Sequence, residues 1–232
     1  MDGILLVDKP AEWTSMDVCA HLRGVLHEKH IGHTGTLDPN ATGLLVVLTG
    51  KGTKAAKYAE NDIKEYHARL RLGVRTDTQD IWGNILEQQE QSLTAQSIEA
   101  ALAGLRGDIL QTPPMYSAIK IRGKKLYEIA RRGGEIHRDP RPVTIYRLEL
   151  TEQDENGDWG LIIECSKGTY IRTLCDSIGE ALGCGGCMSA LRRTRAGAFH
   201  VSQAHTLEDI REAPEKYILP LTLLTGEEAR HE

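Results

Sequence analysis

The stretch GHTGTLDPNATGLL, residues 32–45, contains a carboxylate that could do chemistry. Pro39 fixes its own φ and disfavours the helical conformation at Asp38, and the apolar run at 46–48 predicts a buried strand directly afterwards. The stretch contains three glycines, Gly32, Gly35 and Gly43, and glycine permits a positive φ or the close approach of another group to the backbone. A carboxylate on such a rigid loop can serve as a nucleophile or a general base. The pattern favours a functional loop around Asp38 over an ordinary hairpin connection.

Arg172 is a candidate partner for this carboxylate. It falls in the first turn of a helix predicted over 169–182, where the helix dipole opposes a cation by about 0.3–1 kcal/mol. An ordering partner is therefore expected, and an ion pair with Asp38 would keep the carboxylate charged and oriented. An exposed Arg172 without that role is the alternative.

Two tyrosines could provide flat surfaces for a ligand. In the strand predicted over 63–74, Tyr66 shares one face with the apolar residues at 68, 70 and 72, because side chains alternate with a period of two. A tyrosine on a rigid strand suits stacking, and Tyr170 precedes the helix that carries Arg172. Taken alone, each tyrosine is more often a core residue than a site residue.

The elements that position these residues are mixed in order, which predicts an α+β domain. Strands are expected at 3–7, 43–48, 63–74, 84–88, 143–152 and 159–166. Helices are expected at 16–28, capped by Thr14 or Ser15, and at about 51–60, 94–104, 124–132, 169–182 and 206–212. The Asn156-Gly157 pair predicts a hairpin turn, so that residues 143–166 pair as antiparallel strands. The acidic residues around this turn do not fit the pattern of a calcium-binding loop.

Metal and nucleotide motifs are incomplete. His27-Glu28-Lys29-His30 is one residue short of zinc-protease spacing, and Cys184-Gly185-Gly186-Cys187 lacks a second pair, which favours a glycine-rich turn between a helix and a strand. Gly50-Lys51 fails the phosphate-loop pattern. The five cysteines indicate reduced thiols. We therefore expect no metal and no cofactor.

Length and charge narrow the class further. The chain has 232 residues and a net charge of −5, which argues against a uniformly basic nucleic-acid binder. No apolar run approaches the roughly 20 residues that cross a bilayer, and no basic leader opens the chain, so we expect a cytoplasmic protein without a membrane partner.

Basic residues nevertheless crowd one segment. They are Lys120, Arg122, Lys124, Lys125, Arg131, Arg132, Arg138, Arg141 and Arg147. Such a run is compatible with a solvated face or with a phosphate-binding surface.

Several motifs in one order resemble the bacterial tRNA pseudouridine-55 synthases, whose signature GHTGTLDPxATGLL carries an essential aspartate. The matching segments are GILLVDKP at 3–10 with WTS at 13–15, KEY at 64–66, LGVRTDTQD at 72–80, QTPPMYSAIK at 111–120, GTYIRT at 168–173 and LRRT at 191–194. The resemblance extends to about residue 224. It implies the pseudouridine synthase fold, a mixed, mostly antiparallel central sheet flanked by helices, with an insertion at about 113–142 that clasps RNA.

The resemblance also implies roles for individual residues. Asp38 is then catalytic and paired with Arg172, and Tyr66 stacks on a flipped uracil. The remaining pocket positions are His33, Asp80, Tyr170 and Leu191. The backbone of the RNA is contacted by Lys120, Lys124, Lys125, Arg131 and Arg132.

The implied reaction isomerises a uridine to pseudouridine in the T-loop, at position 55, of transfer RNA. Asp38 would act covalently at the sugar or base, or would remove a 2′ proton to give a glycal, and the sequence leaves these routes open. We expect one catalytic domain over 1–224, a polar tail over 225–232, no RNA-binding PUA domain of the kind most bacterial members carry, and a monomer. A noncatalytic RNA-binding module and a metal-dependent hydrolase are the other classes, disfavoured by the intact Asp38, Tyr66 and Arg172 and by the missing ligand spacing.

Overall fold

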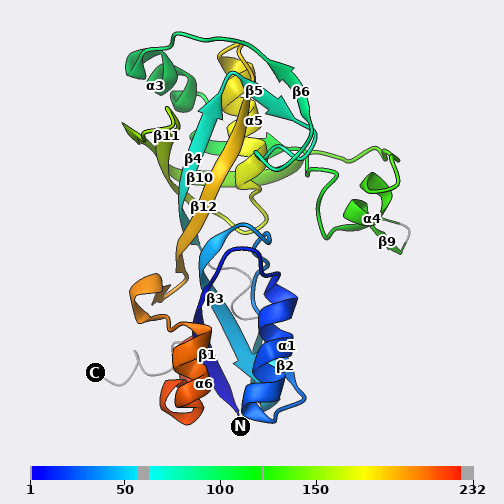
Figure 1. The fold of residues 1–232 in the computed structure, drawn as a ribbon, viewed down its shortest axis with the longest axis vertical. Coiled ribbons are helices and arrows are strands. Elements are labelled where there is room, and N and C mark those ends of the chain that lie inside the picture. Colours follow the sequence, from blue (N-terminus) through cyan, green and yellow to red (C-terminus); the bar gives the residue numbers. More distant parts are fainter. Residues whose placement is uncertain (1, 57–62, 122, 226–232) are drawn as a thin grey trace. The chain divides into compact units, whose positions relative to one another are not determined.

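The computed structural model describes residues 2–56, 63–121 and 123–225. The chain divides into two compact units: unit 1 comprises residues 1–67 and 191–232, and unit 2 comprises residues 68–190 (Figure 1). Strands β4 (Lys64–Leu72) and β12 (Gly186–Ala196) contribute residues to both. Within the described ranges, no helix is long and apolar enough to cross a bilayer.

Unit 1 is built on a small sheet with a packed layer on each face. Its elements are β1 (Gly3–Lys9), α1 (Ser15–Leu26), β2 (Ile31–His33), β3 (Thr42–Thr49), η1 (Gly50–Ala55), β13 (Phe199–His200), η2 (Val201–Gln203), α6 (Leu207–Glu212), η3 (Pro214–Tyr217) and α7 (Thr222–Thr225). Strand β3 pairs antiparallel with β1 and β2 and parallel with the end of β12. Alternate residues of β1 and β3 therefore bury either against α1 and α6 or against the C-terminal segment.

Helix α1 begins and ends as its sequence predicts. Thr14 Oγ1 accepts a hydrogen bond from Asp17 N at 3.0 Å, and the Asp17 carboxylate accepts one from Thr14 N at 2.9 Å, which forms a capping box. The helix ends at Leu26, and His27 follows in the left-handed region with φ 49°. This confirms a helix over 16–28, capped by Thr14, to within two residues.

Unit 2 packs helices on an antiparallel sheet. Its elements, besides the shared strands, are β5 (Val74–Thr76), β6 (Ile85–Gln88), α3 (Ala95–Ala103), β7 (Gly107–Gln111), β8 (Lys120–Ile121), β9 (Lys124–Lys125), α4 (Leu126–Ala130), β10 (Arg141–Gln153), β11 (Trp159–Cys165) and α5 (Ile171–Ala181). Strand β10 pairs antiparallel with β11 and β7. Helix α3 contacts β10 and α5, and it buries Ile98 and Leu102 completely.

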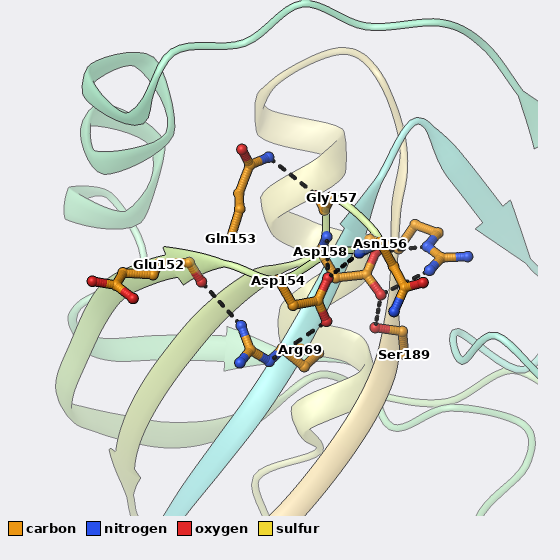
Figure 2. Close-up of polar contacts among 9 residues, drawn as sticks. Arg69, Glu152, Gln153, Asp154, Asn156, Gly157, Asp158 and Ser189 are labelled. Atoms are coloured by element: carbon orange, nitrogen blue, oxygen red, sulfur yellow. Dashed lines mark hydrogen bonds and ion pairs between the residues drawn. The ribbon is translucent and has the colours of Figure 1, made fainter.

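The hairpin between β10 and β11 confirms the Asn156-Gly157 prediction, and Gly157 takes φ 79°. Asp158 is 4% exposed; its carboxylate accepts two hydrogen bonds from Arg71, at 2.6 and 2.9 Å, and one from Ser189 Oγ at 2.6 Å (Figure 2). Asp154, the other aspartate of the turn, accepts hydrogen bonds at Oδ1 from the backbone N–H groups of Asn156 and Asp158. The turn is thus tied by one buried carboxylate to side chains of β4 and β12.

We expect Asp158→Ala to lower the free energy of unfolding by about 2–4 kcal/mol, because Arg71 and Ser189 lose their acceptor while the one-third exposed Arg71 is partly resolvated. Urea unfolding measures the change, with the exposed Glu155→Ala of the same turn as the control. Equal midpoints for the two variants would contradict this role of Asp158.

Several elements differ from the sequence predictions. Strand β12 was not anticipated, because its arginines obscure an alternating buried pattern. The helix expected at 51–60 is a 3-10 turn at Gly50–Ala55, and residues 57–60 lie outside the described part. The helix expected at 124–132 is confined to Leu126–Ala130, since Lys124 and Lys125 belong to a short strand.

Candidate active site

Asp38 lies half-buried in the loop between β2 and β3. Its backbone oxygen accepts a hydrogen bond from Ala41 N at 3.1 Å, which closes a four-residue turn with Pro39 in the second position, where the fixed φ of proline is favoured. Gly43 has φ 96°, as expected from the sequence. Gly32 has neither a positive φ nor a close neighbour, so the expected need for glycine there was wrong.

Two buried polar side chains anchor the middle of this loop. Ser15 Oγ accepts a hydrogen bond from Leu37 N at 2.9 Å and donates one to Leu37 O at 3.2 Å. Lys9, which is fully buried, donates from Nζ to the oxygens of Pro10, Trp13 and Pro39 at 2.8, 2.6 and 2.9 Å. The residues on both sides of Asp38 are therefore held by side chains from β1 and α1.

The ammonium of Lys9 is a charged group in the protein interior. Burial lowers the pKa of Lys9 to about 8, while the charge of Asp38 opposes that shift. Lys9 is consequently mostly protonated at pH 7 and can supply all three donors.

Arg193 holds the two ends of the same loop. The side chain is buried in β12, and it donates from Nε to Leu44 O at 2.7 Å and from Nη2 to Gly35 O at 3.1 Å. Asp38 thus stands in a loop whose start, middle and end are each fixed by a buried polar group.

In unit 2, Arg172 is 4% exposed, so the exposed alternative is wrong. It donates from Nη1 to Thr78 O and from Nη2 to Tyr116 O, both at 2.8 Å, and its Nε lies 3.8 Å from Asp80 Oδ2. The guanidinium therefore joins two separate loops at the start of α5. Its pairing with Asp38, a residue of unit 1, stays a prediction.

Asp80 is itself held in one orientation. Its Oδ1 accepts hydrogen bonds from Thr78 Oγ1 at 2.7 Å and Trp82 N at 3.2 Å. Gln79, directly before it, has φ 63°. A non-glycine residue in this region is uncommon, and here the flanking backbone pairs with Met188, which stabilises the turn.

Tyr170 is fixed through its backbone. Its backbone N–H donates a hydrogen bond to Gln111 Oε1 at 2.7 Å, and its backbone carbonyl oxygen accepts one from Gln111 Nε2 at 3.0 Å. Gln111 is buried, so this amide pair sets the position of Tyr170 at the first turn of α5.

The other predicted site residues of unit 1 occupy strands. Tyr66 is 7% exposed, and buried residues alternate along β4, which confirms its expected face. Leu191 is buried, and its oxygen accepts from Thr42 Oγ1 at 3.5 Å. His33 ends β2, and among the described residues its buried Nδ1 has no hydrogen-bond partner. Burial, aided by the charge of Arg193, lowers the pKa of His33, so its imidazole is neutral at pH 7.

Part of the basic segment flanks α4, whereas Arg141 and Arg147 belong to β10. Lys125 Nζ and the Arg131 guanidinium each lie 5.3 Å from the ring centre of Tyr127, where cations interact favourably with the ring. Lys120, Lys124, Arg131 and Arg132 are exposed, and Arg122 lies outside the described residues. These charges are available to a polyanion.

All five cysteines are free and buried, which confirms the prediction of reduced thiols. Burial raises the pKa of Cys19 and of Cys187 to about 11, so these thiols are poor nucleophiles. Across the part of the chain that the structure describes, no three His, Cys, Asp or Glu residues are grouped to hold a metal ion.

Sequence reasoning missed the residues that support the site. Lys9, Ser15 and Arg193 fix the Asp38 loop, and Gln111 fixes Tyr170. A usable signal existed for Lys9, since a lysine that ends an apolar strand requires polar partners, although the sequence does not say which.

The chain belongs to a family of pseudouridylate synthases, as two family models and several relatives show. Residues 23–171 match the N-terminal domain of the TruB family of pseudouridylate synthases. Residues 172–221 match the tRNA pseudouridylate synthase B C-terminal domain.

Relatives named tRNA pseudouridine synthase B support the assignment. The relative from Alkaliphilus oremlandii is 48% identical, and the match covers 95% of this chain and 74% of the relative. The relative from Opitutus terrae is 46% identical, and the match covers 95% of this chain and 93% of the relative. Among solved structures, the Cbf5-Nop10-Gar1 complex contains a chain with a TM-score of 0.77 and 29% identity. The match covers 96% of this chain and 61% of that one, which confirms the predicted pseudouridine synthase fold.

Proposed function

We propose that this protein isomerises one uridine of transfer RNA, that of the T-loop at position 55, to pseudouridine. The observation that carries the proposal is the Asp38 loop, whose carbonyls at 35, 37, 39 and 44 are all held by buried side chains. Such preorganisation favours chemistry at the carboxylate, because a group that is already held in position loses little further entropy when it reacts. Relatives at 44–48% identity are named for an activity on tRNA.

In this reaction the glycosidic bond from N1 of uracil to C1′ breaks, the base turns, and C5 bonds to C1′ while the proton of C5 is released and N1 takes up a proton. Asp38 either attacks the sugar or base covalently or removes the 2′ proton. Tyr66 stacks on the extruded uracil, and Asp80 orients Arg172. We also assign His33, Tyr170 and Leu191 to substrate binding. No metal or cofactor takes part, and the enzyme acts as a cytoplasmic monomer.

The test measures tritium released from a T-stem-loop RNA that contains [5-³H]uridine, in the presence of a chelator. The native chain is expected to release the label from one uridine, and the same RNA with cytidine at that position releases none. A noncatalytic RNA-binding module would bind the RNA without release, and a metal-dependent hydrolase would lose activity to the chelator. Either outcome would refute the proposal.

The proposal also predicts a steep salt dependence of RNA binding that arises in the basic segment. Each phosphate contact contributes roughly 0.7–0.9 to the slope of log K against log salt concentration. We expect Lys124→Ala and Arg131→Ala each to reduce the slope by about that amount. Filter binding measures it, with Lys216→Ala outside the segment as the control; an unchanged slope in both variants would place the phosphate contacts elsewhere.

A further inference from the structure

Arg193 is a buried cation whose partners are two backbone oxygens of the Asp38 loop. It is 2% exposed, and its hydrogen-bond acceptors within the described part of the chain are backbone oxygens. Burying a guanidinium is costly unless its N–H groups are satisfied. Here the satisfying groups are Gly35 O and Leu44 O, which lie three residues before and six residues after Asp38.

The backbone of Arg193 fixes the same end of the loop. Arg193 pairs with Gly43 in the parallel ladder between β12 and β3. A Cβ at position 43 would approach Arg193 O to 2.3 Å, so the chain leaving the loop lies directly against β12. The backbone contact between Arg193 and Gly43 therefore fixes the start of β3. The hydrogen bond from the guanidinium to Gly35 O then fixes the distance of Gly35 from the start of that strand.

A planar guanidinium suits this task because its donors point in fixed directions. Nε and Nη2 reach two oxygens that are nine residues apart in the sequence, whereas the single ammonium of a lysine cannot reproduce that geometry. Lys9 and Ser15 hold the middle of the loop but contact neither of its ends. The spacing between the two ends thus depends on Arg193 alone among these three side chains.

We propose that Arg193 is a positioning residue for catalysis: by bridging Gly35 O and Leu44 O it sets the conformation in which the loop presents the Asp38 carboxylate. This inference rests on the proposed function, in which Asp38 performs the chemistry. Arg193 itself contacts neither substrate nor reacting atoms in this account.

The test compares Arg193→Lys with Arg192→Lys, the neighbouring arginine, which is paired with Asp8. Single-turnover rates at saturating T-stem-loop RNA, the Kd of that RNA and thermal melting are measured for both. We expect Arg193→Lys to lower the rate about 10- to 100-fold with the Kd within about twofold and a folded protein at the assay temperature. Arg192→Lys should retain the native rate. Guanidinium ions at non-denaturing concentration should partly restore an Arg193→Ala variant.

A native rate in Arg193→Lys, or a rate loss fully explained by weaker binding or unfolding, would overturn the proposal. Amide hydrogen exchange over residues 34–44 separates it from the function itself. Thr34 N and Ala41 N, bonded to Val46 O and Asp38 O, should exchange faster in Arg193→Lys while α5 is unchanged. An inactive native chain refutes the function, whereas unchanged exchange in the loop refutes the positioning role whatever the activity.

Discussion

Asp38→Asn should lower the single-turnover rate of pseudouridine formation by at least about 10³-fold, whether Asp38 is the nucleophile or the base. The amide has the same shape but neither the charge nor the basicity of the carboxylate. The turn should survive, because Asp38 supports it through its backbone oxygen, which bonds Ala41 N. Rapid-quench detection of released tritium from the labelled T-stem-loop gives the rate.

The matched control is Asp108→Asn, which changes an exposed carboxylate on β7 that accepts a hydrogen bond from Thr144 Oγ1 at 2.6 Å. It should keep the native rate. RNA affinity and melting temperature should be native-like in both variants. An Asp38→Asn rate within about tenfold of native would show that another group performs the chemistry.

Arg172→Lys should slow turnover about 100-fold, with a smaller effect on RNA affinity. The native guanidinium donates to Thr78 O and Tyr116 O and lies beside Asp80, so it holds two loops at the start of α5. An ammonium carries all its donors on one nitrogen, so the substituted lysine is expected to lose one of the two oxygens that Nη1 and Nη2 reach separately. One loop is therefore expected to shift, and the buried carbonyl left without a donor should also cost about 1–3 kcal/mol of stability.

Arg75→Lys is the control for this change, since Arg75 is about half exposed and pairs with Asp176 and Glu87. Its rate and melting temperature should be close to native. If Arg172→Lys were as active as Arg75→Lys, the buried arginine would be structural only, and its predicted pairing with Asp38 would lose its functional basis.

The parts of the fold that sequence could predict are those governed by local rules. The capping box at Thr14 and the Asn156-Gly157 turn follow from short-range chemistry. The buried face of Tyr66 follows from the alternation of side chains along one strand. The Asp38 loop was located because glycine and proline restrict the backbone at known positions.

The parts that escaped prediction depend on contacts between distant segments. Arg193 meets Gly35 across 158 positions, and Lys9 meets Pro39 across 30, so neither partner is visible from a local pattern. Strand β12 was missed for the same reason, because its arginines look solvent-exposed until their buried acceptors are known. The sequence thus supplied candidate reactive residues, whereas the groups that hold them needed the three-dimensional structure.

The most direct measurement of the central claim is chemical mapping of pseudouridine at every uridine of a full-length tRNA transcript after incubation with the native chain. We expect quantitative conversion at the single T-loop uridine, at position 55, and none after incubation with Asp38→Asn. Conversion at other uridines in its place, or no conversion by folded protein that binds the tRNA, would contradict it.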